Sequence, residues 1–228
     1  MSDPRLAASR LVIFDLDGTL VDSGADIAAA AGHARRAAGL EPLPDAVTIG
    51  YVGDGTRRLL ERVLAHDLRT GELGPPVATA ALEQGLADFG DHYAEHLLEH
   101  TVLYPGIAGL LERLVDRRLM IATNKPRRFT LAILAGLGIA DRFERVVAGD
   151  DAPVRKPDPA HLAACLAGTA LGPERCVMVG DSPNDVLAAR GLGMPAVAVS
   201  WGLVARRRLV AAAPTVLVDS VEELDAVL

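Results

Sequence analysis

The sequence predicts an α/β fold in which a parallel sheet forms the core and a helical segment is inserted after the first strand. The apolar run at 11–14 belongs to a predicted strand at 11–15 and has the continuous hydrophobicity of a strand that is buried on both faces of such a sheet. No alternation typical of strands interrupts residues 20–100. From residue 103 onward, apolar strand patterns alternate with helical patterns, which is typical of βαβ units.

The first hundred residues are expected to be helical once the opening strand has ended. Residues 1–10 are predicted to be a frayed lead-in, and residues 18–24 a loop or a tight hairpin. Apolar spacing and alanine-rich composition predict helices at 26–38, 56–64 and 77–100, with glycine- and proline-rich breaks at 39–44 and 70–76.

The remainder of the chain is expected to return to the sheet through a hinge at 103–106 and then to alternate. Strands are predicted at 119–124, 145–148, 176–180, 196–200 and 216–218. Helices are predicted at 107–117, 127–137, 160–168, 184–191 and from 221 onward.

The composition argues against several classes of function. The net charge of -7 argues against a nucleic-acid-binding face, which would carry a basic excess. No N-terminal stretch resembles a signal peptide, and no apolar run approaches the roughly 20 residues of a membrane span. We therefore expect a cytoplasmic monomer or homodimer without nucleic-acid or membrane partners. Cys165 and Cys176 are expected to be buried free thiols rather than a disulfide.

Two carboxylates, Asp15 and Asp17, follow the first predicted strand directly. Open parallel sheets bind their ligands at the carboxyl ends of the strands. Neighbouring like charges there cost free energy unless a cation or a changed protonation state offsets them. Mg²⁺ is the simplest offset because it prefers oxygen ligands. An acidic turn that closes the strand without a metal is the alternative.

The whole segment Asp15–Ser23 resembles the nucleophile motif of phosphatases in the haloacid dehalogenase superfamily. The resemblance implies a Rossmann-like parallel-sheet core at 1–20 and 103–228, and an inserted α-helical cap domain at 21–102. It also implies that Asp15 attacks phosphorus to form an aspartyl-phosphate, while Asp17 protonates the leaving oxygen and later activates water. A halide leaves without a proton, so an aspartate at position 17 favours phosphoryl transfer over dehalogenation.

Two further motifs match parts of that site. The resemblance implies that Thr123 binds the phosphoryl group and that Asn124 donates a hydrogen bond, although both residue types also cap helices. Lys156, in a Lys-Pro-Asp-Pro segment, is implied to neutralise Asp15 and the phosphoryl oxygens. A surface lysine before a turn is the alternative for this position.

The segment 180–185 places a carboxylate at the end of another predicted strand, and a second one four residues later. The resemblance implies that Asp181 binds Mg²⁺ together with the Asp15 carboxylate and the backbone carbonyl of Asp17. Asp185 is implied to hold a metal-bound water or to orient Lys156. A plain helix start is the alternative for this segment.

Within the superfamily, the sequence is most similar to the phosphoglycolate phosphatases, through the segments 53–55, 123–126 and 149–151. This similarity implies hydrolysis of 2-phosphoglycolate, a small phosphorylated metabolite, to glycolate and phosphate. In the cap, Gly53, Asp54 and Gly55 precede a predicted helix whose N-terminus favours an anion. Arg57 in its first turn either pairs with a substrate carboxylate or is solvated.

Other functions remain open at this point. A sugar-phosphate phosphatase or mutase and a pyrophosphatase would share the same motifs, and a module that binds phospho-ligands without turnover is the alternative from another class. Phosphonate hydrolases place an imine-forming lysine in the cap, and residues 20–100 contain none. His92, His96 and His100 recur every four residues, as a transition-metal site would require, but their acidic neighbours favour a solvated helix face.

Overall fold

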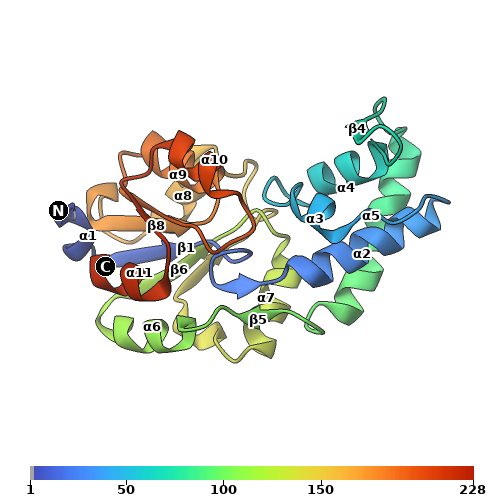
Figure 1. The fold of residues 1–228 in the computed structure, drawn as a ribbon. Coiled ribbons are helices and arrows are strands. Elements are labelled where there is room, and N and C mark those ends of the chain that lie inside the picture. Colours follow the sequence, from blue (N-terminus) through green and yellow to red (C-terminus); the bar gives the residue numbers. More distant parts are fainter. Residues whose placement is uncertain (1–2) are drawn as a thin grey trace. The chain divides into compact units, whose positions relative to one another are not determined.

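The computed structural model describes residues 3–228, which divide into two compact units. One unit contains the described residues up to Asp22 together with Val102–Leu228, and the other contains Ser23–Thr101. In Figure 1 the larger unit carries the sheet and both chain ends, whereas the smaller unit is built mainly from helices.

A six-stranded parallel sheet forms the core of the larger unit, which confirms the predicted α/β architecture. Its strand order is β10-β9-β8-β1-β6-β7. The strands are β1 (Leu11–Phe14), β6 (Arg118–Ala122), β7 (Arg145–Val147), β8 (Cys176–Gly180), β9 (Ala196–Val199) and β10 (Val216–Val218). Strand β1 lies between β6 and β8, and Leu11 pairs with Arg118 on one side and with Cys176 on the other. All four residues of β1 are buried, as a central parallel strand requires.

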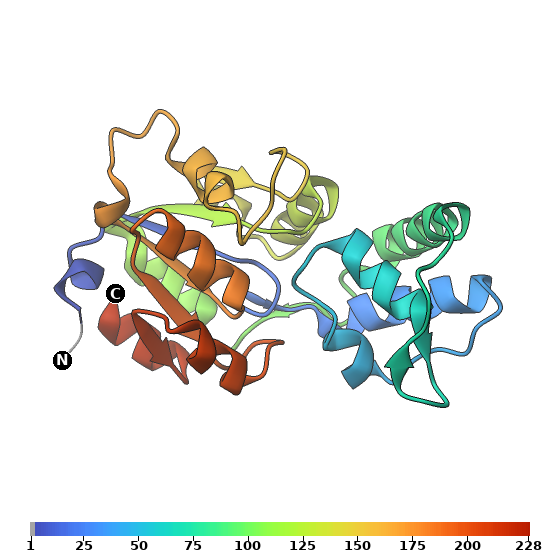
Figure 2. The same ribbon diagram turned by 90° about the horizontal axis from the view of Figure 1, so that it is seen from above.

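Helices cover both faces of this sheet (Figure 2). One face carries α8 (Pro159–Leu166), α9 (Pro183–Gly191) and α10 (Arg206–Ala212), and the other carries α6 (Ile107–Arg113), α7 (Arg127–Gly136) and α11 (Val221–Val227). Side chains alternate across a strand, so Leu11 and Ile13 point to the same face. They pack in one apolar cluster with Leu162, Val186 and Leu209 of the first three helices.

The smaller unit contains α2 (Gly24–Ala37), α3 (Asp45–Ile49), α4 (Thr56–Ala65) and α5 (Thr79–His96). Where the sequence suggested no strand, two short strands pair antiparallel, β3 (His66–Asp67) and β4 (Glu72–Leu73). The expectation of a strand-free segment was therefore wrong. The turn forms because Gly71 takes a φ of +74° and donates its N–H to the carbonyl of Asp67 at 2.8 Å.

The chain passes between the two units twice, and a short antiparallel pair of strands within the larger unit joins these two segments. Strand β2 (Val21–Asp22) pairs with β5 (Val102–Leu103), so the chain leaves and re-enters the sheet-bearing unit at one place. This pair takes the position of the predicted loop or hairpin at 18–24 and of the start of the predicted hinge at 103–106.

The N-terminal segment differs from the predicted frayed lead-in. Residues 1 and 2 lie outside the described residues, but α1 (Pro4–Ala7) is an ordered helical turn. Asp3 caps it by accepting the N–H of Arg5 at 2.9 Å, and Leu6 is fully buried. An apolar anchor and a cap therefore order a segment that its terminal position suggested would fray.

Two other sequence predictions can be compared with the structure. Cys165 and Cys176 are both buried free thiols, as predicted. Nowhere in residues 3–228 does a helix combine the length and the apolar character needed to cross a bilayer.

Candidate active site

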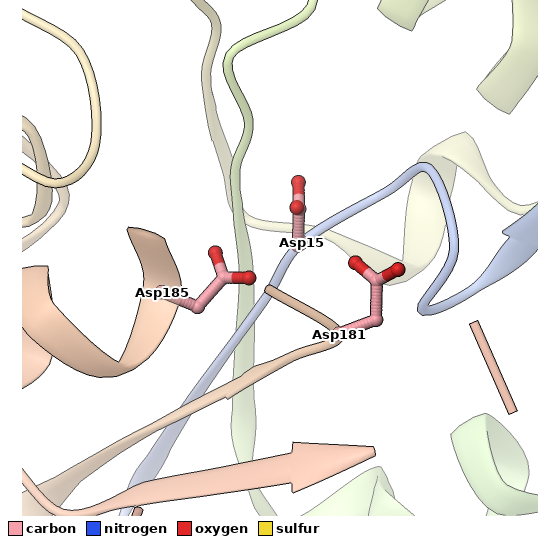
Figure 3. A group of neighbouring side chains, drawn as sticks. All are labelled: Asp15, Asp181 and Asp185. Carbon is pink, nitrogen blue, oxygen red and sulfur yellow. The ribbon is translucent and has the colours of Figure 1, made fainter. Parts of the chain in front are cut away.

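Three carboxylates converge at the carboxyl end of the sheet (Figure 3). Asp15 follows β1, Asp181 follows β8, and Asp185 lies in the first turn of α9. Each side chain offers an oxygen, and these three oxygens lie within 4.8 Å of one another. Because β1 and β8 are neighbouring parallel strands, their carboxyl ends meet at one edge, and this topology brings Asp15 to Asp181.

Lys156 joins two of these carboxylates. Its Nζ lies 3.1 Å from Oδ1 of Asp15 and 2.6 Å from Oδ1 of Asp185, and it donates to the carbonyl of Ala122 at 2.6 Å. Burial alone would lower the pKa of Lys156, but Asp15 and Asp185 outweigh burial and raise it. The ammonium therefore stays charged although it is buried, because its two carboxylate partners compensate for the loss of hydration.

Asn124 holds the backbone of Lys156 in place. Its side-chain amide donates to the carbonyl of Lys156 at 2.9 Å, and its Oδ1 accepts the N–H of Lys156 at 3.0 Å. Thr123 precedes it at the end of β6, is buried, and accepts the N–H of Lys125 on its hydroxyl oxygen at 3.2 Å. The structure thus brings Thr123, Asn124 and Lys156 to the edge of the sheet where Asp15 lies.

Asp17 points to a different cation. Its two carboxylate oxygens lie 3.0 and 3.2 Å from Nζ of Lys125, and both side chains are largely buried. Gly18, which follows at a φ of +79°, turns the chain after Asp17. Among the described residues, the carboxylates grouped within 4.8 Å of one another are those of Asp15, Asp181 and Asp185 and do not include that of Asp17. That the backbone carbonyl of Asp17 binds a metal stays a prediction.

Asp181 is held by backbone and by close packing. It accepts the N–H of Leu203 on Oδ2 at 2.7 Å. A Cβ on Gly18 would lie 2.1 Å from Oδ2 of Asp181, and a Cβ on Gly202 would lie 2.4 Å from its Cβ. Only glycine fits at these two positions while Asp181 keeps its place.

Asp185 is held by the start of its own helix. Ser182 donates both its N–H, at 3.0 Å, and its hydroxyl, at 2.7 Å, to Oδ2 of Asp185. Together with the contact of the Asp185 backbone N–H to the Ser182 side chain, the bond from the Ser182 N–H forms a capping box at the N-terminus of α9. Oδ1 remains directed at Lys156, which is the orienting contact predicted as one alternative for Asp185.

The electrostatics of this group favour a bound cation. Burial raises the pKa of Asp15 to about 6; Lys156 opposes this shift, whereas Asp185 and Asp17 add to it. Burial, followed by Asp15 and Asp185, raises the pKa of Asp181 well above its usual range. A set of buried carboxylate oxygens that repel one another matches the ligands of a hard divalent ion, so the three aspartates can hold one.

The cap residues predicted to meet the substrate all lie in the smaller unit. Gly53 and Gly55 take φ values of +118° and +88° immediately before α4. Asp54 pairs with Arg62 at 2.7 Å, and Arg57 pairs with Glu83 at 2.9 Å with both side chains about half exposed. The roles of these residues in substrate binding stay predictions.

The cap histidines do not converge on one point. Nδ1 of His96 lies 2.6 Å from Glu99, while Nδ1 of His100 lies 2.8 Å from Asp26. The ring of His92 lies at 4.4 Å from that of His96 and at 4.6 Å from that of His33, on α2, with the planes tilted. His92 and His96 therefore lie together, whereas His100 is directed at Asp26.

Sequence reasoning missed two features of the site. The pairing of Lys125 with Asp17 joins residues 108 positions apart. The one signal available in the sequence was that Lys125 and Lys156 are the only lysines in the chain. Gly202 and Leu203, which pack on Asp181, follow β9 in a segment without charged residues. A glycine three residues after the buried strand β9 was the signal at that position.

Comparison with known proteins relates this arrangement to one family. A model of the haloacid dehalogenase-like hydrolases matches residues 9–193. Over 196 residues the chain is 40% identical to a phosphoglycolate phosphatase of Chromobacterium violaceum, a match that covers 85% of this chain and 86% of that protein. It is 36% identical to phosphoglycolate phosphatase 1 of Pseudomonas aeruginosa, with coverage of 94% and 78%.

Solved structures agree with these sequence matches. The crystal structure of a predicted phosphoglycolate phosphatase from Haemophilus somnus has a TM-score of 0.88 and 28% identity, and the match covers 97% of this chain and 99% of that one. A putative phosphoglycolate phosphatase from Lactobacillus delbrueckii gives a TM-score of 0.86 at 27% identity, with coverage of 96% and 98%. The similarity therefore extends over both units of the fold.

Proposed function

The chain belongs to the haloacid dehalogenase-like hydrolases, and from this premise we propose that it is a Mg²⁺-dependent phosphomonoester hydrolase that acts through an aspartyl-phosphate on Asp15. The observation that carries the proposal is the Asp15 carboxylate at the end of β1, paired with Lys156 and beside Asp181. This is a nucleophile beside a cation and a group able to bind a divalent metal.

In the first step an oxygen of Asp15 attacks phosphorus, and the bond from phosphorus to the bridging ester oxygen breaks. Asp17, two residues further along the chain, gives its proton to that oxygen, and the alcohol leaves. The Lys156 ammonium lies 3.1 Å from Asp15, where it favours the ionised nucleophile and attracts the transferring phosphoryl oxygens. The Thr123 hydroxyl supplies a neutral hydrogen-bonding group at the same edge.

In the second step Asp17 accepts a proton from a water molecule whose oxygen attacks phosphorus. The bond between phosphorus and Asp15 breaks, the carboxylate is restored, and inorganic phosphate leaves. A divalent ion bound by Asp15 and Asp181, and by the Asp17 carbonyl, would supply charge neutralisation for these buried carboxylates and the phosphoryl group. Asp185 holds Lys156 in both steps, because its Oδ1 lies 2.6 Å from that ammonium.

The substrate we propose is 2-phosphoglycolate, which would be hydrolysed to glycolate and phosphate. Support comes from the relatives in Chromobacterium violaceum and Pseudomonas aeruginosa, both phosphoglycolate phosphatases. We propose that the helical segment at 21–102 serves as the cap that selects this small molecule and excludes water.

The test is steady-state hydrolysis of a panel of phosphate esters with Mg²⁺, comparing the wild type with Asp15→Asn. The panel contains 2-phosphoglycolate, several hexose phosphates, pyrophosphate and an aryl phosphate. Asp15→Asn should reduce turnover of every substrate to the assay background, because an amide is not a nucleophile here. The matched control is Asp141→Asn, which changes an exposed aspartate of the same unit and should keep wild-type rates.

Two outcomes would contradict the proposal in different ways. Full activity in Asp15→Asn would refute the covalent mechanism. Activity that depends on Asp15 but favours hexose phosphates or pyrophosphate would keep the mechanism and refute the proposed substrate.

A further inference from the structure

Both lysines of this chain lie buried at the carboxyl end of the sheet, and only one of them faces the phosphoryl-transfer nucleophile. The ammonium of Lys156 contacts Asp15, Asp185 and the carbonyl of Ala122. Lys125 lies against Asp17, at 3.0 and 3.2 Å from its two oxygens, and its side chain is 5% exposed. The site therefore contains a second desolvated cation, placed beside the acid that serves the leaving group.

The cations that follow Lys125 in sequence face elsewhere. Arg127 binds Asp151 at 2.6 Å and is half exposed. Arg128 is exposed, and its guanidinium lies over the ring of Phe129 at 4.4 Å. Within the segment 125–128, Lys125 is the residue whose charge is directed at Asp17.

The position of Lys125 can be related to the chemistry of the leaving group. Asp17 must reach the bridging oxygen in order to protonate it. Whatever the substrate carries one carbon beyond that oxygen consequently lies beside Asp17, and hence beside the ammonium that touches both oxygens of Asp17. In 2-phosphoglycolate a single methylene separates the bridging oxygen from a carboxylate.

The charge balance points the same way. In the step in which Asp17 carries the proton that it gives to the leaving oxygen, Asp15, Asp181 and Asp185 contribute three negative charges from the protein, and Lys156 together with one divalent ion balances them. The positive charge of Lys125 then offsets the negative charge of a carboxylate on the leaving group, because the burial of an uncompensated charge is costly.

We propose that Lys125 determines substrate specificity by pairing with a carboxylate on the leaving group, so that the enzyme prefers phosphate esters of 2-hydroxy acids to their neutral analogues. This inference rests on the proposed phosphoryl transfer to Asp15. It places the recognition of the carboxylate in the larger unit, on a side chain already beside the acid, and not on Arg57, which pairs with Glu83.

The test compares two substrates that differ only in this charge, 2-phosphoglycolate and its neutral amide, 2-phosphoglycolamide. Wild type and Lys125→Met are assayed on both, because methionine keeps the length of the side chain without its charge. Arg128→Met is the matched control, since it removes a neighbouring exposed cation. Lys125→Arg tests whether charge alone restores the preference.

The wild type should favour 2-phosphoglycolate, mainly through a lower KM. Lys125→Met should therefore lower kcat/KM for 2-phosphoglycolate by about 10- to 100-fold. Its loss on the amide should be smaller, so that the ratio of the two specificity constants falls by about tenfold or more. Lys125→Arg should recover part of that ratio, and Arg128→Met should keep it.

Equal losses on both substrates would overturn the proposal, because Lys125 would then act only through Asp17. Equal KM values for the two substrates in the wild type would also overturn it, and this result does not depend on how well the variant folds. Asp15-dependent turnover of other esters with no preference for the carboxylate would refute the specificity and leave phosphoryl transfer standing. Absence of any Asp15-dependent turnover would refute the proposed function itself.

Discussion

Asp181 lies in a space that exists because two residues packed against it have no side chain. A Cβ on Gly202 would lie 2.2 Å from the carbonyl oxygen of Gly18 and 2.4 Å from Oδ2 of Asp181. Trp201 holds the same segment by donating its indole N–H to the carbonyl of Thr19 at 3.2 Å. The position of a proposed metal ligand thus depends on a contact between two backbone segments about 180 residues apart.

Gly202→Ala should disable the site more than it destabilises the fold. The added methyl must displace Asp181 or the turn at Gly18, so we expect a large loss of turnover and a higher Mg²⁺ requirement. Steady-state assays over a Mg²⁺ titration would measure both. Gly32→Ala is the control: the new Cβ on α2 would meet Arg36 and Pro42 at ordinary distances of 3.6 Å. This control should keep activity and gain about 1 kcal/mol of stability from helix propensity. Wild-type activity in Gly202→Ala would contradict the positioning of Asp181 by this contact.

At the residue scale, the sequence was informative for residues whose chemical type and whose position after a predicted strand or turn point to the same place in the fold. Asp15, Asp181 and Lys156 each follow a recognisable strand or turn, and parallel topology dictates that neighbouring strand ends meet. The sequence did not predict that Asp17 pairs with Lys125, because this salt bridge depends on the conformation of the long lysine side chain. Steric exclusion at Gly202 likewise depends on a tertiary contact that no local pattern encodes.

At the scale of elements, one buried aspartate ties the ends of the smaller unit together. Asp26, in the first turn of α2, accepts the N–H of His100 at 3.0 Å and of Thr101 at 2.8 Å. It also accepts the Thr101 hydroxyl at 2.7 Å. Burial raises the pKa of Asp26, but these hydrogen bonds together outweigh it and hold the pKa below its usual value. The segment after α5 is therefore ordered by α2 and not by continued helix.

Asp26→Asn should destabilise the protein near neutral pH and should remove part of its acid sensitivity. Because the folded pKa is lowered, the charged form contributes stability above the unfolded pKa of about 3.9, and that stability is lost as pH falls through the folded value. We expect a cost of about 1.5–3 kcal/mol at pH 7 that shrinks below about pH 4. Urea unfolding at several pH values would measure it.

The control for this prediction is Asp91→Asn, which changes an exposed aspartate on α5 in the same unit. It should leave the free energy of unfolding within about 0.5 kcal/mol of wild type. A cost for Asp26→Asn that grows toward low pH would contradict the assigned sign.

Helices and strands with a clear hydrophobic pattern were predicted from the sequence, and those without one were missed. Buried strands such as β1 and β8 are continuous apolar runs, and their bounds agree closely with the predicted ones. The hairpin at 66–73 was missed because both residues of β4 are exposed and its turn relies on Gly71 and Asp67. Helix α1 was missed because its order comes from Leu6, which packs in the interior.

At the scale of the whole molecule, function and stability oppose each other at the edge of the sheet. The fold brings Asp15, Asp181 and Asp185 together within one buried group. The raised pKa values of Asp15 and Asp181 mean that ionising both without a cation costs free energy of folding. Removal of one of these carboxylate charges should therefore lower catalytic activity and raise the stability of the metal-free protein.

Asp181→Asn should raise the melting temperature of the metal-free protein and abolish its response to Mg²⁺. The pKa of Asp181 is raised by burial and then by Asp15 and Asp185, so the folded state binds more protons than the unfolded state, and metal-free stability falls as pH rises toward neutrality. The asparagine is neutral and can still accept the N–H of Leu203, which Asp181 accepts at 2.7 Å.

In the wild type, Mg²⁺ at 100 times its Kd adds about 2.7 kcal/mol to the free energy of unfolding, which a chelator should remove. Trp201, the single tryptophan, lies beside Thr19 in the same unit and reports its unfolding by fluorescence. A metal-free variant less stable than metal-free wild type at pH 7.5 would show that Asp181 is not a destabilising charge, and a variant that Mg²⁺ still stabilises would show that Asp181 is not a required metal ligand.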